Sequence, residues 1–459
     1  MRRPGTGDTL EGFRLGEVVH AGAYAVLHAA THPDHPGPIL VKLPLLQSTD
    51  PAAVVSFEME QMILPRLSGR HVPRVLGLGD FAADPFIAME RIPGPNLAAR
   101  APDLPLPPDE VAEIGAKVAT ALADIHRQRV SHLDVKPANI LFREDGTAVL
   151  VDYGLAHHGD LPDLLAEEIR LPLGTAPYMA PRQTLGLRDD PRSDLFALGV
   201  VMYEMATGVL PYGNPQHLRA ARRRLWRDPV PPRRLRPEIP PALQEIILRC
   251  LEPDPADRHP GAGALAFDLR NGAGVRLTAR ATRTQRDPWL KAIQRRVNLD
   301  TSPARAKPAD TAHSAPIVVI ALDLADTSPE LATALRRSLG NVIAARPGAR
   351  VACVNVIVQA LLGGDAPLDE EGRSVRVQRL VEMRHWAAPL GLTEGRITFH
   401  VLEGPSAADA IVDYAAANAA DHLVVGARTE GVFRKRLGPV AAEVITNAPC
   451  SITVVRPRH

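Results

Sequence analysis

Cysteine, aromatic residues and net charge are all scarce in this chain of 459 residues, which has three cysteines and 4% aromatic residues. The cysteines, Cys250, Cys353 and Cys450, are far apart and lie in apolar stretches, which favours buried thiols over disulfides or a zinc site. Lysine and arginine together number 53 and aspartate and glutamate 52, so the formal net charge is +1. The composition therefore gives no reason to expect nucleic-acid binding.

Long apolar runs are also missing. The start of the chain, "MRRPGTGDTLEGFRL", lacks the apolar run of about seven or more residues that a secretory signal needs. No later segment has the roughly 18 consecutive apolar residues of a membrane span. We therefore expect a cytoplasmic chain without a membrane partner, and the length predicts more than one domain.

The first block, residues 10–270, opens with short runs typical of strands, such as "PILVKLP", and continues with helical patterns. In "DEVAEIGAKVATALADIHRQR" the apolar residues recur at spacings of three and four, as on one face of a helix. Residues 271–313 are rich in Arg, Thr, Ala and Pro, which predicts a linker with one short helix around "PWLKAIQRRVNL".

The second block, residues 314–459, begins with the apolar run "APIVVIALDLAD" and then alternates predicted helices and strands. Strict alternation with apolar strands is typical of an α/β doubly wound parallel sheet. The sequence therefore predicts a second domain of a different fold class from the first.

Two short motifs in the first block carry residues suited to phosphoryl transfer. That reaction needs a base for the acceptor hydroxyl, cations for the developing charge, and ligands for Mg²⁺. In "HLDVKPANIL", Asp134 can accept the hydroxyl proton, Lys136 can steady the phosphate and Asn139 can bind a metal. In "VLVDYGLA", Asp152 supplies a second metal ligand.

These motifs resemble the HRDLKPENIL and DFG signatures of the eukaryotic-type serine/threonine protein kinases of bacteria. The resemblance implies an α+β bilobal fold, with an N-lobe at about residues 10–92 and a C-lobe at about 93–270. It also implies ATP and Mg²⁺ as cofactors, a protein substrate, and a metal site formed by Asn139 and Asp152.

The resemblance extends upstream to the nucleotide site. "ILVK" is similar to the strand whose lysine, here Lys42, contacts the α- and β-phosphates, and Glu60 in "FEMEQMILPRL" corresponds to the glutamate that pairs with it. In "FIAMERI", Met89 corresponds to the gatekeeper, and the backbone from Glu90 to Ile92 is expected to bind adenine. Lys42 or Glu60 taken alone would be interpreted as an ordinary charged surface residue, but the order of the motifs along the chain favours the catalytic interpretation.

Further motifs give the remaining expected site residues. "GTAPYMAP" resembles the segment that contacts the substrate residue, with Thr175 near Asp134, and "SDLFALG" places Asp194 beneath the catalytic loop. The glycine loop keeps only Gly22 and has His20 and Ala25 at the outer glycine positions. Since glycine permits close approach of the backbone to phosphate, this change predicts a weaker nucleotide cradle.

Two departures concern regulation and docking. Arg182 replaces a glutamate that in the family pairs with an arginine resembling Arg258, so we expect Arg182 to turn to solvent. Leu133 replaces the arginine that binds a phosphorylated activation loop. Residues 157–174 contain no Ser, Thr or Tyr, and we expect this loop to be held by apolar packing of its leucines beside Leu133.

The six core polar groups are all present, namely Lys42, Glu60, Asp134, Lys136, Asn139 and Asp152. Their survival favours a non-specific serine/threonine protein kinase that acts in bacterial stress signalling. The alternative is a catalytically inactive pseudokinase scaffold that binds partners or nucleotide.

The second block resembles the universal stress protein family. Members that bind ATP have an acid after the first strand, here Asp323, and a glycine-rich stretch, of which Gly426, Gly431 and Gly438 remain. Pro439 stands where a hydroxyl residue is expected and offers no amide donor. The resemblance implies a nucleotide-sensing domain or a dimerisation domain that pairs through its last strand, "SITVVRP".

Overall fold

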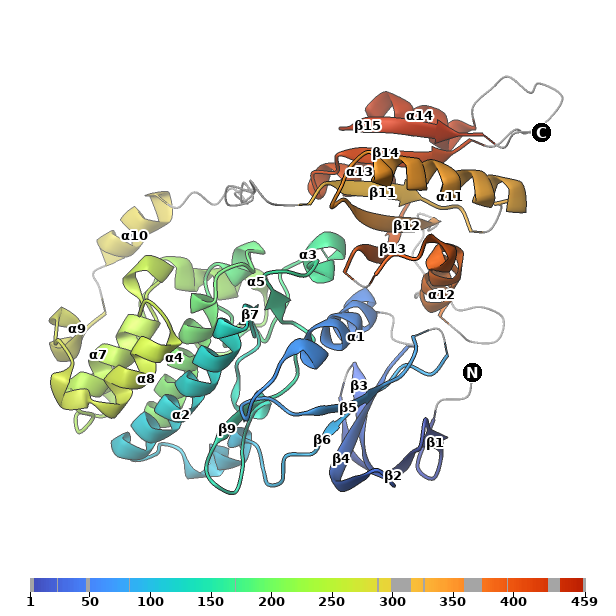
Figure 1. Cartoon of the computed structure of the whole chain (residues 1–459). Coiled ribbons are helices and arrows are strands. Elements are labelled where there is room, and N and C mark those ends of the chain that lie inside the picture. Colours follow the sequence, from blue (N-terminus) through green and yellow to red (C-terminus); the bar gives the residue numbers. More distant parts are fainter. Residues whose placement is uncertain are drawn as a thin grey trace.

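The computed structural model describes residues 4–22, 24–46, 50–81, 83–169, 171–286, 289–298, 315–324, 327–358, 374–393, 395–427 and 438–456. Figure 1 shows a sheet-rich lobe, a helix-rich lobe and a third body built on a separate sheet. Within these ranges, every helix is too short or too polar to cross a bilayer.

The sheet-rich lobe is a six-stranded antiparallel sheet in the order β1-β2-β3-β4-β6-β5. Along β4, Ile39, Val41 and Leu43 are buried in the core on one face of the sheet. Because side chains alternate along a strand, Lys42 lies on the opposite face. The strands are β1 (Thr9–Leu10), β2 (Phe13–Ala21), β3 (Ala25–His32), β4 (His35–Pro44), β5 (Val75–Leu78) and β6 (Ile87–Glu90).

Helix α1 (Pro51–Ile63) connects β4 to β5 and is buried along most of its length. It begins with favourable capping, because Asp50 accepts a hydrogen bond from the Ala52 N–H and Pro51 occupies the first turn. A helix that is buried on nearly all sides must be covered by more than one body. Figure 1 shows α1 between the first sheet and the third body.

The helix-rich lobe is organised around α2 and α4, which pack against each other. Two short antiparallel pairs, β7 with β10 and β8 with β9, flank the loop that carries Asp134. The elements are α2 (Pro108–Arg127), β7 (Val130–Ser131), β8 (Ile140–Phe142), β9 (Ala148–Leu150), β10 (His157–His158), α3 (Leu164–Glu168), α4 (Arg192–Thr207), α5 (Leu218–Ala221), α6 (Pro232–Leu235), α7 (Pro241–Cys250) and α8 (Ala262–Arg270).

Two helices lie within the stretch expected to be a linker. Helix α9 (Ala279–Thr282) packs against α7, because the Gln244 side chain donates hydrogen bonds to the carbonyls of Arg280 at 2.7 Å and Arg283 at 2.9 Å. Helix α10 (Trp289–Asn298) follows it and coincides with the short helix expected there. The first part of this stretch is therefore attached to the helix-rich lobe.

The third body is a five-stranded sheet in the order β13-β12-β11-β14-β15, with every neighbouring pair parallel. This order confirms the predicted α/β doubly wound sheet, and its strand order reverses between β11 and β14. The elements are β11 (Ile317–Ala321), α11 (Pro329–Ala344), β12 (Arg350–Val358), α12 (Val375–Ala387), β13 (Ile397–Gly404), α13 (Ala407–Ala417), β14 (His422–Gly426), α14 (Pro439–Asn447) and β15 (Ser451–Val455).

The third body contacts the rest of the chain through α3, which packs against β13 and α13. In Figure 1, α1 lies below β13, and α3 lies to the left of β13. The largest apolar cluster runs without a break from the helix-rich lobe through α1 into the third body, where it includes Leu380 and Met383. The domains therefore share a packed interface.

Candidate active site

Three charged side chains from three different elements meet above the inner face of the first sheet. The Lys42 ammonium donates to Glu60 Oε2 of α1 at 2.5 Å and to Asp152 Oδ1 at 2.8 Å. The other oxygen of Glu60 accepts the Tyr153 N–H at 3.4 Å. Helix α1 and the segment that follows β9 are thereby joined to the sheet through one lysine.

The electrostatics of this group favour its charged state. Burial alone would lower the pKa of Lys42, but attraction to Asp152 and Glu60 outweighs burial and raises the pKa. The same attraction to Lys42 lowers the pKa of Asp152 from 3.8 to about 2. Lysine and aspartate are therefore both charged at neutral pH, as phosphate and metal binding require.

A second cluster surrounds Asp134, which is buried in the loop between β7 and β8. Lys136 donates to Asp134 Oδ2 at 2.6 Å and to Thr175 Oγ1 at 3.0 Å, while the Thr175 hydroxyl donates to Asp134 Oδ1 at 2.8 Å. The structure thus brings the predicted base, the predicted cation and the predicted substrate-segment threonine into direct contact.

Asn139 and Asp152 provide oxygens that fit a divalent cation. The Asn139 side-chain nitrogen donates to the Asp134 carbonyl at 3.0 Å and to its carboxylate at 3.1 Å, so the amide oxygen is the atom that remains for a cation. The Asp152 side chain is 45% exposed despite its contact with Lys42. Amide and carboxylate oxygens are the ligands that Mg²⁺ prefers.

Asp194 of α4 fixes the backbone of the catalytic loop from below. It is completely buried, and its carboxylate accepts the N–H groups of His132 at 2.8 Å and Leu133 at 2.7 Å. His126 of α2 contacts the same carboxylate at 2.8 Å. Because a buried charge needs such partners, these bonds hold the loop in one conformation.

Leu133 itself is 4% exposed and has a left-handed backbone with φ of 60°. Its carbonyl accepts a hydrogen bond from the Gln183 side chain at 2.8 Å, a contact that the sequence did not suggest. Leu164 and Leu165 of α3 belong to the main apolar cluster, among whose residues Leu133 is not found. Packing of these leucines directly beside Leu133 stays a prediction.

The predicted adenine-binding strand is β6, which ends at Glu90. The N–H groups of Glu90 and Arg91 are already bonded to the carbonyls of Arg74 at 2.8 Å and Pro38 at 2.9 Å. Met89 and Ile92 are both buried, at 6% exposure each. Arg143 forms an ion pair with the Glu90 carboxylate and so lowers the pKa of Glu90. This ion pair was not predicted from the sequence.

The predicted glycine loop is the turn between β2 and β3. The Gly22 N–H donates to the Ala25 carbonyl at 2.9 Å, which closes this hairpin. A Cβ atom added to Gly22 would lie 3.5 Å from His20 Nε2, so the histidine ring stands directly beside the glycine. His20 is exposed and is therefore available to solvent or to a phosphate.

Comparison with known families gives the identity of both bodies. Residues 13–266, more than half of the chain, match the protein kinase domain, and residues 316–456 match the universal stress protein family. The chain belongs to the protein kinase family. The bilobal α+β fold expected from the sequence is therefore the kinase fold, and the third body is a universal stress protein domain.

Several curated relatives are serine/threonine kinases of bacteria. Pkn3 of Myxococcus xanthus is 36% identical over 50% of this chain and 45% of its own length. PknL of Mycobacterium tuberculosis is 33% identical over 48% of this chain and 55% of its own length. A probable serine/threonine-protein kinase of Clostridium perfringens is 34% identical over 46% of this chain and 31% of its own length. The chain thus spans about half or less of the length of these relatives, each of which is named as a kinase.

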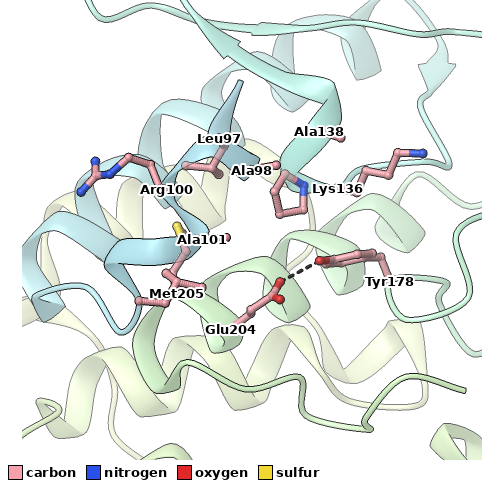
Figure 2. A pocket seen from close by; sticks show the side chains of 11 residues that line it. Leu97, Ala98, Arg100, Ala101, Lys136, Ala138, Tyr178, Glu204 and Met205 are labelled. Carbon is pink, nitrogen blue, oxygen red and sulfur yellow. Dashed lines mark hydrogen bonds between the residues drawn. The ribbon is translucent and has the colours of Figure 1, made fainter. Parts of the chain in front are cut away.

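A groove of about 190 Å³ lies beside the catalytic loop of the kinase domain (Figure 2). Its wall includes Lys136 and Leu97, and it is closed at one side by Tyr178, whose hydroxyl donates to Glu204 Oε2 at 2.7 Å. Burial and this hydrogen bond raise the pKa of Tyr178. Neither Tyr178 nor Glu204 was predicted from the sequence, although the motif "APYMAP" contains the tyrosine.

Arg182, which was expected to turn to solvent, and Arg258 have separate partners in the kinase domain. Arg182 lies 3.6 Å from Asp189, and its side chain is 35% exposed. Arg258 is buried and donates to the carbonyls of Glu252, Arg192 and Pro253 at 2.8 to 3.0 Å. Backbone carbonyls therefore replace the missing glutamate around Arg258.

The predicted nucleotide site of the universal stress protein domain is described only in part. Asp323 follows β11 and Gly426 ends β14, and these adjacent parallel strands meet where the strand order reverses. Gly438 precedes α14, which begins with Pro439 and so lacks one amide donor. Gly431 lies outside the described residues.

Proposed function

We propose that the chain is an ATP-dependent, Mg²⁺-requiring serine/threonine protein kinase that transfers the γ-phosphate to hydroxyl groups of a protein substrate. The observation that carries the proposal is the contact of Lys42 with both Glu60 and Asp152, at 2.5 and 2.8 Å. This arrangement requires α1 and the metal-binding segment to be correctly placed at the same time.

Each residue of the site then has a role. Lys42 would bind the α- and β-phosphates, and the Ile92 backbone would contact adenine. Asn139 and Asp152 would hold a Mg²⁺ ion, which would supply positive charge for the phosphates. Asp134 would orient the substrate hydroxyl and accept its proton, and Lys136 would stabilise the negative charge on the transferred group.

The choice of serine or threonine as acceptor is supported by the position of Lys136. This lysine lies between Asp134 and Thr175, beside the groove that Tyr178 and Glu204 close. The groove reaches the catalytic loop and has the size to receive a side chain of the protein substrate. Every residue in its wall belongs to the kinase domain.

Phosphate transfer from radiolabelled ATP to a general acceptor protein tests the proposal. We expect Asp134→Asn and Lys42→Ala each to lower the rate by about 100-fold or more, because a base or a charge clamp contributes at least this much. Matched controls on α2 are Asp109→Asn at an exposed position and Lys117→Ala at a half-buried one, which we expect to retain the wild-type rate.

The alternative is a pseudokinase scaffold that binds nucleotide or partners without catalysis. Equal background incorporation by the wild type, Asp134→Asn and Lys42→Ala would reject the kinase proposal in favour of this scaffold. A role in stress signalling and a cytoplasmic location stay predictions from the sequence.

For the universal stress protein domain we propose a second nucleotide site near Asp323 and Gly426. Its support is that both residues lie at the reversal of strand order, where doubly wound sheets bind ligands. Calorimetric titration of the Lys42→Ala variant with ATP should still detect one binding site. Adding Asp323→Ala to this variant should abolish the remaining ATP binding. Absence of binding in Lys42→Ala would leave pairing through the edge strand β15 as the function of this domain, which sedimentation would show as a dimer.

A further inference from the structure

Three carboxylates of the kinase domain are buried in the interface with the universal stress protein domain. Glu167 and Glu168 end helix α3, and Glu58 lies in the middle of α1. Their side chains are 9%, 2% and 4% exposed. Buried carboxylates are costly unless cations accompany them, and in each case the cation comes from the other domain.

Glu167 is bound by three groups of the universal stress protein domain. Arg350 of β12 donates to both of its oxygens, at 2.7 and 3.1 Å. The Tyr414 hydroxyl of α13 donates to Oε2 at 3.1 Å, and His400 Nε2 lies 3.2 Å from the same atom. A bidentate arginine with two further donors is a complete receptor for one carboxylate.

Glu168 has its own cation in the same interface. Arg376 of α12 donates to its Oε2, and His400 Nδ1 lies 3.1 Å from its Oε1. The imidazole of His400 is completely buried and stands between the two glutamates. The last two residues of α3 are therefore both held by side chains of the other domain.

Glu58 extends the contact to α1. Its Oε1 accepts a hydrogen bond from Arg384 of α12 at 2.5 Å. The Arg384 guanidinium also lies over the ring of Phe81 in the kinase domain and over that of Phe399 in β13, at 5.4 and 5.0 Å. The arginine thus packs against aromatic rings of both domains.

The two helices held in this way are those that position the active site. Glu58 precedes Glu60 by two residues on α1, and Glu60 pairs with Lys42. Helix α3 lies in the segment between Asp152 and Thr175, and it packs against α1. Contacts that hold α1 and α3 in place therefore also hold the Lys42–Glu60 pair and the segment that leads to Thr175.

The kinase domain lacks the phosphate that usually orders this segment, although its own Arg188 binds Asp163 there at 2.7 Å. Residues 157–174 contain no hydroxyl that could carry a phosphate, and Leu133 provides no charge to receive one. Arginine–phosphate pairs usually order such segments. Here arginine–carboxylate pairs across the domain boundary take their place.

We propose that the universal stress protein domain is an intramolecular activator, which binds Glu58, Glu167 and Glu168 and thereby holds α1 and α3 in the catalytically aligned arrangement. This inference rests on the proposed kinase function. The docked state is the aligned one, because the Lys42–Glu60 pair and the Asp134–Lys136–Thr175 cluster are both formed in it. The groove beside Lys136 is lined by kinase-domain residues alone, so docking leaves it uncovered.

Undocking, by contrast, would release α1 and α3 together. Removal of Arg384 takes away the cation that pairs with the buried Glu58, and removal of Arg350 and Arg376 together leaves one imidazole, His400, for both Glu167 and Glu168. The chain escapes this penalty when the domains separate and the carboxylates return to water. A smaller fraction of the molecules is then in the aligned state, and kcat falls in proportion to that fraction. Arg350, Arg376 and Arg384 are therefore positioning residues.

The test compares the full-length wild type with Arg350→Ala/Arg376→Ala and with Arg384→Gln. We expect kcat to fall by about tenfold or more in both variants while KM for ATP changes less, because alignment rather than the nucleotide site is lost. Arg384→Lys keeps the single charged hydrogen bond to Glu58 and should recover most of kcat. Arg337→Ala, on the exposed face of α11, is the matched control with wild-type kcat.

Hydrogen exchange of the α1 and α3 amides decides the proposal independently of activity. We expect faster exchange of both helices in Arg350→Ala/Arg376→Ala and Arg384→Gln, and no change in Arg337→Ala. An unchanged exchange pattern, or a rise in kcat that marks the domain as an inhibitor, would overturn the proposal. A wild type that transfers no phosphate would instead refute the proposed kinase function, and the exchange data would still decide whether the domain fixes these helices.

Discussion

Raising the pH from 6 to 9 is expected to weaken the interface at α3, because His400 there loses its proton. Burial alone would lower the pKa of His400, but its hydrogen bonds to Glu167 and Glu168 outweigh burial and raise the pKa from 6.5 to about 9. Glu167 stays ionised over this range, because the His400 and Arg350 contacts overcome burial and lower its pKa to about 2. The other charged or titratable groups around the ring are Glu58, Glu168, Arg350, Arg376 and Tyr414.

The size of the effect follows from the two pKa values. A raised folded-state pKa stabilises the fold fully below pH 6.5, and this stabilisation is lost as the pH rises through about 9. Each pKa unit corresponds to about 1.4 kcal/mol, so the protonated His400 contributes about 3 kcal/mol at pH 6 and about 2 kcal/mol at pH 7.5. At pH 9 less than about 0.5 kcal/mol remains.

The assay is urea unfolding of the full-length wild type and of His400→Gln at pH 6.0, 7.5 and 9.0. Comparison of the two proteins at each pH cancels the titration of every other group that both contain. We expect the difference in unfolding free energy to fall by about 3 kcal/mol across the series. His385→Gln, an exposed histidine on α12, should show no such trend.

A difference between wild type and His400→Gln that stays constant from pH 6.0 to 9.0 would refute this reasoning. It would mean that His400 has the same proton affinity in the folded and unfolded chain. The two glutamates would then not share a charged imidazole, and the interface would depend on the arginines alone.

Two glycine substitutions test the packing of the kinase domain, both by thermal unfolding of the full chain. Gly199→Ala on α4 should destabilise the fold by about 1–3 kcal/mol, because the added Cβ would lie 2.6 Å from Cys250 Cβ in a core that cannot easily move. Gly263→Ala on α8 meets open space and should stabilise the fold by about 0.5–1 kcal/mol, since it restricts the unfolded chain. Equal effects of the two substitutions would contradict this packing.

Much of the kinase site was predictable because its residues occur in short motifs with fixed spacing. Lys136 and Asn139 follow Asp134 within one loop, so the local chain brings them together. The long-range pairing of Lys42 with Glu60 was predictable only through resemblance to a family. Periodicity and strand alternation gave the fold classes, since both depend on local patterns of apolar residues.

The interface between the domains was not predictable in the same way. His400 and Arg376 lie more than 200 positions from Glu168 in the sequence, and nothing in their local pattern indicates a shared site. The available signal was the excess of acids in residues 157–174, which hold four carboxylates, Glu167 and Glu168 among them, and a single arginine, Arg170. Apolar packing of leucines was expected to hold that segment, whereas the structure adds ion pairs, and the cations that bind Glu167 and Glu168 come from the folded second domain.

The two glutamates of α3 also determine how such an enzyme could be switched off. A phosphatase can remove the phosphate from an activation loop, but the carboxylate of a glutamate is part of the encoded chain and is not removed. Because both domains belong to one chain, the effective concentration of the receptor is high and independent of expression level. The enzyme's resting state would be set by a docking equilibrium, and any molecule that binds the receptor arginines would compete with its own activation segment.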